Sequence, residues 1–539
     1  MVRVFVVFVL LVGSGLAQAN AGYEKVVEIF HAVENYRQPL LTKKNLDYSP
    51  NAVEARHAQL RALRKQLDGI DPSAWSVSER VDYLLVRSQL DKLEFEFRVL
   101  RPWSRDPGLY VDLVREIPYV NLPVAGKKLE QLRAQLSDVP NILAHGKSNL
   151  TGAAGELAKL ALRDLEKSDG VNHEQAFRAV PPAGVLGWYD DLEQQAKTKQ
   201  ADLLPLVVTA HNAVKDFHAW LQRNLPRMTA PAGIGAKEYD WYLQHVDLEP
   251  YNTEDVLKAG ELEFARTMTA LALERQRNQG LPPLVPAASA EEYEQRKRAA
   301  DALVREFIAK KHFLTIPDYG KGQAFDNDVP WLVRDGGKRN FWEEIEYRDP
   351  LPDKIHAGLP GHSFDLFLHD HDTRPIRSKI EDGGRIEGWG FYLEEATMNA
   401  GLLDERPRTR ELFWIFAIAR SLRNKAEVML QTNQWTVAQA VDFMVKNVPW
   451  MNEDVARVDC EIYLREPTYG QNYQMGKLQI EQLLAERELQ LGDKFDLGHF
   501  HDEFLAAGTI PISLIRWEMT GKDDQVKQFW QAQAAHSTQ

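Results

Sequence analysis

Two histidines and a glutamate are the residues of this sequence best suited to chemistry. His356, His362 and Glu387 supply two imidazoles and one carboxylate, the ligand types that hold a catalytic zinc ion and leave one position open for water. In metallopeptidase helices a glutamate directly follows the first histidine and acts as general base. Ala357 occupies that position here. The sequence therefore predicts a hydrolytic type of zinc site without its usual base.

Another carboxylate could replace the missing base. Asp365 lies three residues after His362, close to the same face of a helix, and we interpret it as the candidate substitute. Glu381 and Glu394 are also near in sequence. General acid and base assistance contributes roughly 10²- to 10⁴-fold to a rate, so its loss cripples an amidase without necessarily silencing it.

Helices must position these side chains, because helix start signals recur along the chain. Ser76 with Glu79, Ser289 with Glu292 and Thr436 with Gln439 have the spacing of a capping box. Apolar periodicity follows each pair, and the second pair precedes a long predicted helix over residues 291–311. The fold class predicted is mainly α, with a few short strands beside the metal site in residues 322–347, where Val329, Trp331, Leu332 and Val333 gather.

Composition indicates one large folded unit. The chain has 539 residues, of which 44% are apolar and 27% charged, so it buries a substantial core. Breaks fall where proline and glycine gather, and none resembles a flexible linker. We predict a helical N-terminal part, residues 22–230, packed as one unit on a C-terminal metallopeptidase-like part, residues 231–539. The net charge of −13 argues against nucleic acid as a partner.

The first 21 residues are typical of a secretory signal peptide. Arg3 precedes an apolar run, and small residues at Ala19 and Ala21 suit cleavage after Ala21. The run is short for a membrane span, and no later stretch is long and apolar enough to form one. We expect a periplasmic or secreted protein. Cys460, the only cysteine, is flanked by acids and is interpreted as a buried, unreactive residue.

Two further groups of residues contain possible metal ligands or clustered charges. His369, Asp370, His371 and Asp372 combine nitrogen and oxygen donors, so they form either a second metal cluster or, as we prefer, a solvated segment. Glu343, Glu344 and Glu346 are interpreted as a solvated helix face, with selection of a cationic peptide end as the alternative.

Several motifs resemble a known family. The run from Ile355 to Ser363 resembles the His-Glu-Ala-x-Pro-Gly-His-His motif of the bacterial domain of unknown function 885, and Glu387 to Glu394 is similar to its Glu-Gly-Trp-Ala-Leu-Tyr-Ala-Glu segment. Further matches are Pro467, Tyr473 and Gly476, then Phe495 to Leu497, Phe500 to Asp502, Gly508 and Pro511, and upstream Tyr83 to Leu90 and Trp103 to Tyr110. Members of that family look like gluzincin-type zinc metallopeptidases.

The resemblance implies roles and also reveals departures. Tyr473 matches a family tyrosine that would donate a hydrogen bond to a developing oxyanion. Arg420 and Arg423 resemble family arginines that buttress the site or grip a substrate carboxylate. Ala357, Ser363, Gln431 and Tyr469 stand where the family pattern has glutamate, histidine, histidine and glutamine.

Two hypotheses of function follow. The first is an exported zinc metallohydrolase, most plausibly peptidase-related, in which water activated by zinc attacks a peptide carbonyl, with His356, His362 and Glu387 as ligands. The second is an inactive relative that binds peptides or serves as a scaffold. The resemblance favours the first, and the lost polar groups at 357, 363 and 431 favour the second.

Overall fold

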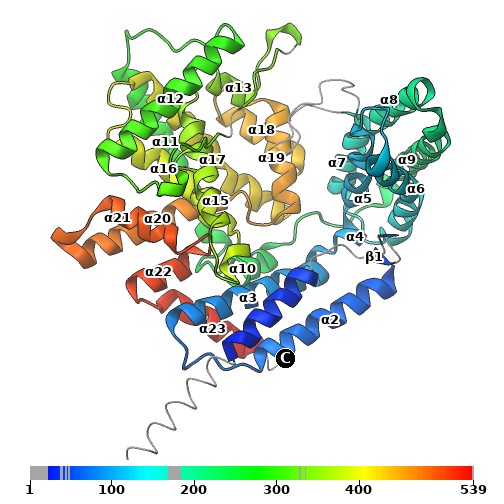
Figure 1. Ribbon diagram of the computed structural model, residues 1–539, viewed down its shortest axis with the longest axis horizontal. Coiled ribbons are helices and arrows are strands. Elements are labelled where there is room, and N and C mark those ends of the chain that lie inside the picture. Colours follow the sequence, from blue (N-terminus) through cyan, green and yellow to red (C-terminus); the bar gives the residue numbers. More distant parts are fainter. Residues whose placement is uncertain are drawn as a thin grey trace, which may run out of the picture.

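Helices account for most of the described chain in the computed structural model. The structure describes residues 22–36, 41–42, 45–46, 49–167, 184–326, 329–333 and 335–536. The predicted signal peptide, residues 1–21, lies outside the described residues. The mainly α prediction is confirmed (Figure 1).

Long helices at the N-terminal end pack on the C-terminal part of the chain. They comprise a helix over residues 22–36, α2 (Pro50–Asp68), α3 (Val77–Phe95) and the π-helical turn η1 (Glu96–Leu100). Side chains such as Val33, Leu67 and Leu84 join one hydrophobic core with residues of the C-terminal half. Two strands of two residues each, β1 (Leu41–Thr42) and β2 (Asn45–Leu46), pair antiparallel. They lie in the chain between the helix over residues 22–36 and α2.

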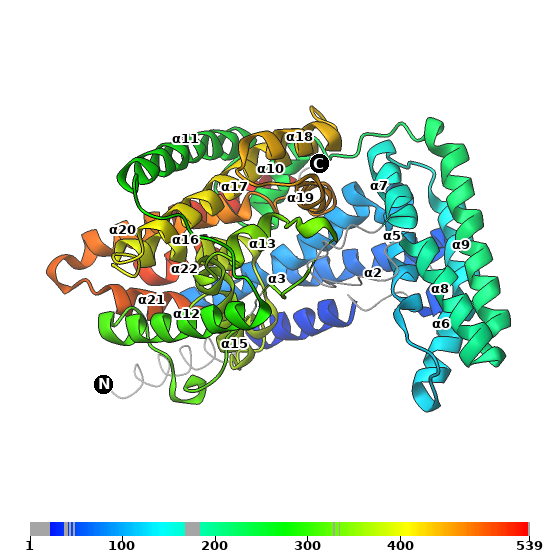
Figure 2. The ribbon, with the colours of Figure 1, turned by 90° about the horizontal axis from the view of Figure 1, so that it is seen from above.

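A second group of helices has a hydrophobic core of its own and stands apart in both views (Figures 1 and 2). It is built from α4 (Pro102–Arg105), α5 (Pro107–Arg115), η2 (Ile117–Tyr119), α6 (Gly126–Asn149), α7 (Gly155–Glu166), α8 (Gly184–Lys199), η3 (Ala201–Leu203), α9 (Leu204–Asn224) and η4 (Leu225–Arg227). The hydrophobic cores therefore divide the predicted N-terminal part. Most buried residues before about 100 share the core of the C-terminal part, whereas most of those in 110–228 form another. Ala154, Leu157 and Leu160 of α7 join the first core.

The C-terminal part surrounds the predicted site with helices. They are α10 (Ala236–His245), α11 (Thr253–Arg277), α12 (Ala290–Lys311), η5 (Asp318–Gly320), η6 (Asp335–Gly337), α13 (Phe341–Glu346), α14 (Leu351–Asp353), η7 (Lys354–Gly358), α15 (His362–Asp370), η8 (Arg377–Lys379), α16 (Gly383–Asn399), α17 (Pro407–Gln431), α18 (Val437–Asn447), α19 (Glu453–Arg465) and α20 (Asn472–Leu491). The chain ends with η9 (Gly492–Lys494), α21 (Leu497–Ala506), α22 (Ile512–Thr520) and α23 (Asp524–His536).

Helix starts follow the predicted local chemistry. Ser76 and Thr436 form complete capping boxes at α3 and α18, in which side chain and backbone satisfy each other's hydrogen bonds. At α12 the Ser289 side chain accepts from the Glu292 backbone N–H, but the Glu292 carboxylate accepts from Ala288, one residue earlier than predicted.

Two local predictions are wrong. The described residues of 322–347 form turns, η6 and α13, and contain no strand. The acidic run there is not a solvated face, because Glu343 and Glu346 are fully buried. Glu343 completes a capping box with Asn340, and Glu346 accepts a hydrogen bond from Tyr293 at 3.4 Å. Buried hydrogen-bond partners replace the water that the charge run was expected to meet.

Candidate metal centre

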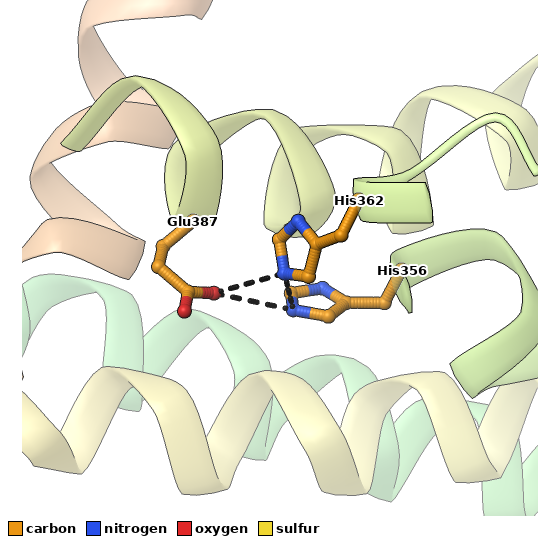
Figure 3. Close-up of side chains that lie close together, drawn as sticks. All are labelled: His356, His362 and Glu387. Carbon is orange, nitrogen blue, oxygen red and sulfur yellow. Dashed lines mark hydrogen bonds and ion pairs between the residues drawn. The ribbon is translucent and has the colours of Figure 1, made fainter. Parts of the chain in front are cut away.

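Three neighbouring elements carry the predicted ligands to one point. His356 lies in η7, His362 is the first residue of α15, and Glu387 is on α16. Figure 3 shows the three side chains pointing toward one another. Gly361 makes the turn between the histidines possible, because a Cβ there would lie 1.8 Å from the His356 carbonyl oxygen.

The spacing of the donor atoms fits a tetrahedral metal ion. His362 Nε2 lies 3.1 Å from His356 Nε2 and 3.1 Å from Glu387 Oε2, and His356 Nε2 lies 3.4 Å from that oxygen. Zinc bonds of about 2.0 Å at tetrahedral angles place ligand atoms about 3.3 Å apart. Within the described chain this is the one group of three or more titratable ligands compact enough for an ion. The residues present therefore fit zinc.

A buried carboxylate stands behind the first histidine. Glu394 Oε1 lies 2.8 Å from His356 Nδ1, an ion-pair contact whose angle departs from an ideal hydrogen bond. Arg420 in turn contacts Glu394 at 2.9 Å. A carboxylate at this nitrogen favours the proton on Nδ1 and leaves the Nε2 lone pair toward the metal position. Burial and Arg420 lower the pKa of His356, but Glu387 and Glu394 together raise it above its ordinary value.

Glu387 is held as a carboxylate. Burial alone would raise its pKa, but His362 and His356 bring the pKa well below the usual value. Its second oxygen, Oε1, accepts a hydrogen bond from the Tyr469 hydroxyl at 3.4 Å. The carboxylate thus presents Oε2 to the imidazoles and Oε1 to a phenol.

Glycines let the surrounding helices approach the site closely. A Cβ on Gly390 would lie 2.7 Å from the His356 ring and 3.0 Å from the His362 ring. On the same helix, a Cβ on Gly388 would lie 2.5 Å from Gly476 of α20. Small residues at these positions permit the contact between α16 and α20 that brings Tyr473 beside the histidines.

Aromatic residues hold α16 in place. Trp389 is fully buried and donates from Nε1 to the Pro360 carbonyl at 3.1 Å, which ties the Glu387 helix to the turn between the two histidines. The Tyr392 hydroxyl lies 2.9 Å from His501 Nε2. Both side chains orient the helix rather than face the metal position.

Asp365, the proposed substitute base, is engaged elsewhere. Both of its oxygens accept from the Arg385 guanidinium, at 3.0 and 3.1 Å, and both side chains are buried. A carboxylate bound on both oxygens to arginine is a structural partner and a poor proton acceptor. The role predicted for Asp365 is therefore replaced by a structural one.

Tyr473 lies beside the site. Its ring is parallel to that of His356, with ring centroids 6.1 Å apart and 10° between planes, and its hydroxyl is 3.5 Å from that of Tyr469. Burial raises the pKa of Tyr473 well above its ordinary value, so it is a proton donor at neutral pH and not an acceptor.

The family arginines are bound in buried ion pairs. Arg420 contacts Glu394, and Arg423 contacts Asp459 at 3.0 Å. The Arg423 guanidinium also lies 4.3 Å from the centre of the Tyr473 ring. These contacts support buttressing of the site, one of the two roles that the resemblance implies for these arginines.

Other predicted positions are not brought to the metal centre. Gln431 is buried and bonds to the backbone of Ile234 and Tyr463. His362, and not the adjacent Ser363, faces His356. The donors of residues 369–372 do not converge on one another: His369 bonds to Thr509, and Asp372 to Arg374.

Sequence reasoning missed Tyr469 as a member of the site. It was noted only as a departure from the family pattern, and its contact with Glu387 depends on the packing of α20 against α16, 82 residues apart in sequence. Its spacing of four residues before Tyr473 is the signal that could have found it, since two hydroxyls one turn apart share a direction.

The comparisons decide the family. Residues 36–312 and 354–519 match a bacterial protein family of unknown function, DUF885. The chain belongs to this family. Two solved structures share the fold over 93% of this chain and 98% of theirs, each at 16% identity: "a putative lipoprotein of unknown function" from Shewanella oneidensis, with a TM-score of 0.69, and "the putative lipoprotein" from Colwellia psychrerythraea, with a TM-score of 0.68. The comparison with curated proteins gives no match. Among the described helices, none is long and apolar enough to cross a membrane.

Proposed function

We propose that this DUF885 protein is an exported zinc-dependent hydrolase related to peptidases, with His356, His362 and Glu387 as the zinc ligands. The observation that carries the proposal is the convergence of their three donor atoms at separations of 3.1 to 3.4 Å. A zinc ion held there supplies Lewis-acid activation of water and of a carbonyl group.

The other residues of the site orient these ligands. Glu394 lies 2.8 Å from His356 Nδ1 and favours the proton there, Arg420 pairs with Glu394, and the Tyr469 hydroxyl donates to the outer oxygen of Glu387. Each contact fixes a ligand rotamer before zinc binds, which reduces the entropy lost on binding. Tyr473, whose hydroxyl lies 3.5 Å from that of Tyr469, is the proposed hydrogen-bond donor to the oxyanion.

Proton acceptance is the weak step in this site. Ala357 cannot accept a proton, and Asp365 is bound to Arg385. Absence of a general base lowers a hydrolytic rate by roughly 10²- to 10⁴-fold. We therefore propose slow turnover of peptide or peptide-like substrates.

The lack of a general base also favours a second function. A zinc site with fixed ligands and no base binds a carbonyl or carboxylate without cleaving the chain, so the alternative is an inactive relative that binds peptides or acts as a scaffold. Ala357 and the buried Asp365–Arg385 pair are the observations in its favour.

Export of the protein is part of the proposal. The two proteins of similar fold are described as putative lipoproteins, and lipoproteins are exported. Residues 1–21 have the pattern of a cleaved signal. Cys460 is buried in α19.

A peptide library distinguishes the two functions. We expect zinc-loaded wild-type protein to cleave members of the library slowly and to stop when the zinc is chelated. Glu387→Ala should remove both zinc and cleavage, whereas Glu405→Ala, at an exposed acid with no role in the site, should retain both. Zinc binding with cleavage no faster than that of Glu387→Ala would establish the non-catalytic alternative.

A further inference from the structure

A cavity of about 580 Å³ lies beside the C-terminal end of α15. Its walls come from three separate parts of the chain, within residues 315–319, 365–374 and 502–509. The volume falls in the range of about 300 to 1,000 Å³ that small-molecule sites occupy. None of the three metal ligands lines it, and His369 lies about 10 Å along the α15 axis from His362. The cavity is therefore separate from the metal centre.

His369 presents an unbound nitrogen to this cavity. The residue is 7% exposed and lines the wall. Thr509 donates its only hydroxyl hydrogen to the Ile380 carbonyl, so the contact of 2.9 Å between Thr509 Oγ1 and His369 Nδ1 requires the proton on Nδ1. Nε2 of the neutral ring is then an acceptor without a hydrogen-bond partner among the described residues, since the Glu381 carboxylate lies 4.0 Å away. A buried acceptor left open at a cavity wall points to a ligand with a donor.

Other groups of the wall are also acceptors. Nδ1 of His371 lies 2.8 Å from the Phe367 carbonyl oxygen, which only accepts, so Nδ1 carries the proton and Nε2 of the neutral ring has a lone pair. Asp502 accepts from the Thr315 backbone N–H at 2.8 Å and from its hydroxyl at 2.7 Å. These neutral donors leave further lone pairs on the carboxylate. The cavity therefore suits a ligand rich in hydrogen-bond donors.

The charges of the wall leave one carboxylate unbalanced. Asp365 is paired with Arg385, and Asp372 with Arg374. Asp502 has no ion pair with a cation in the described part of the chain, because its printed contacts are the two with Thr315. A positively charged ligand would balance Asp502.

An exposed aromatic ring forms another wall. Tyr319 is 52% exposed and stacks on His371, with ring centroids 4.5 Å apart and 23° between planes. Pro317 and Leu505 line the cavity beside it. An aromatic face attracts a cation, and a planar cation in addition stacks on it.

We propose that this cavity binds the guanidinium group of arginine, either free or as a side chain of a peptide. A guanidinium has five N–H donors and no acceptor, a planar face that stacks on tyrosine and a charge that pairs with Asp502. An ammonium group is a compact, strongly hydrated charge that does not stack, so lysine binds more weakly. Within the described chain, only the metal centre brings three titratable ligand atoms close enough for an ion, so the donors of the cavity do not suit a metal.

Matched side chains test the proposal on the wild-type protein. The probes are N-acetyl-arginine amide, its citrulline analogue and its lysine analogue, titrated calorimetrically at pH 7. Citrulline keeps the shape of arginine but replaces one nitrogen by a carbonyl oxygen and has no charge. We expect arginine to bind at least about tenfold more tightly than citrulline, because charge-assisted hydrogen bonds are the stronger ones, and more tightly than lysine. No detectable binding of the arginine probe, or equal or tighter binding of either analogue, overturns the proposal.

Two further comparisons identify the source of the ligand and separate the cavity from the zinc site. Affinity for N-acetyl-arginine amide equal to or above that for free arginine assigns the cavity to a peptide side chain, and binding of free arginine alone assigns it to the amino acid. Because no metal ligand lines the cavity, the preference should be the same in metal-free and zinc-loaded protein. A protein that binds no zinc but prefers arginine would overturn the proposed function and leave the cavity assignment standing.

Variants of the wall locate the preference. Asp502→Asn keeps an oxygen for Thr315 and removes the charge, and His369→Asn keeps a donor for Thr509 and removes Nε2. Both should reduce the preference for arginine over citrulline while circular dichroism shows an intact fold. Asp442→Asn, at an exposed acid paired with Lys446, should retain it. An unchanged preference in folded Asp502→Asn protein overturns the assignment to this cavity, even if His369→Asn fails to fold.

Discussion

Glu394 lies behind His356, with its Oε1 2.8 Å from Nδ1, on the side of the imidazole opposite the nitrogen that faces Glu387 and His362. A carboxylate at this distance favours the proton on Nδ1. Because Arg420 neutralises the same carboxylate, Glu394 orients the ring without adding an unpaired charge to the site. Carboxylates in this outer position are typical partners of metal-bound histidines, and the proposed zinc site rests in part on this contact.

The contact between Glu394 and His356 predicts a loss of zinc affinity on mutation. Glu394→Gln should weaken zinc binding by about 10- to 100-fold, since a neutral amide no longer holds the proton on Nδ1. Competition with a chromogenic chelator measures the change. Glu405→Gln, at an exposed position, is the matched control, and an unchanged zinc affinity in Glu394→Gln would show that the carboxylate only neutralises Arg420.

Restoration of a base at position 357 should raise hydrolysis. Ala357→Glu places a carboxylate directly after His356, and we expect peptide cleavage to increase by up to about 10²- to 10⁴-fold. Ala357→Gln has nearly the same volume and no basic oxygen, so it should give no increase. Ala357 is buried, and circular dichroism of both variants checks that the larger side chain is accommodated. If the folded, zinc-loaded glutamate variant cleaves no faster, the site lacks more than its base.

The ion pair between Asp365 and Arg385 predicts a structural effect. Asp365→Asn leaves the fully buried Arg385 without its charge partner and should lower the free energy of unfolding by about 3 kcal/mol. Urea denaturation measures it. Asp442→Asn removes an exposed ion pair with Lys446 and should have little effect. A stable Asp365→Asn protein that has lost activity alone would return Asp365 to a catalytic role.

Glu427 predicts a pH dependence of stability. Burial raises its pKa to about 8 from 4.5, despite hydrogen bonds from Gln471 and Tyr239. The folded protein therefore keeps a proton that the unfolded chain has lost, and this contribution to stability falls as pH rises from about 4.5 to 8, by at most about 1.4 kcal/mol per pH unit. Glu427→Gln stays neutral.

Stability curves of the Glu427 variant and the wild type should diverge accordingly. Urea unfolding at pH 5, 6.5 and 8 should show the glutamine variant gaining stability relative to the wild type at each step. Parallel curves at the three pH values would mean that Glu427 titrates normally in the folded state.

Short-range patterns explain which features the sequence could predict. The capping boxes at Ser76 and Thr436 involve residues three apart, and their hydrogen bonds form wherever the helix forms. His356 lies in η7, and His362 begins α15, the helix that follows it. Glu387 lies in the first turns of α16. Local geometry and the family motif together were sufficient to assemble these three residues.

Long-range packing explains what could not be predicted. The sequence predicts that Glu343 and Glu346 are solvated, because it does not reveal their contacts with Asn340 and Tyr293 in the folded chain. The partner of Asp365 is Arg385, on another helix. Tyr469 reaches Glu387 only through the glycine contact between α16 and α20. Each outcome is decided by the approach of distant elements, which periodicity in one segment does not reveal.

Metal content of the wild-type protein tests the central claim most directly. Protein purified without a histidine tag, supplied with zinc and dialysed, should contain about one zinc per chain by atomic emission, and His356→Ala, His362→Ala and Glu387→Ala should each fall far below that level. A wild-type content near zero, or a full equivalent retained in all three variants, would contradict the assignment of zinc to these residues.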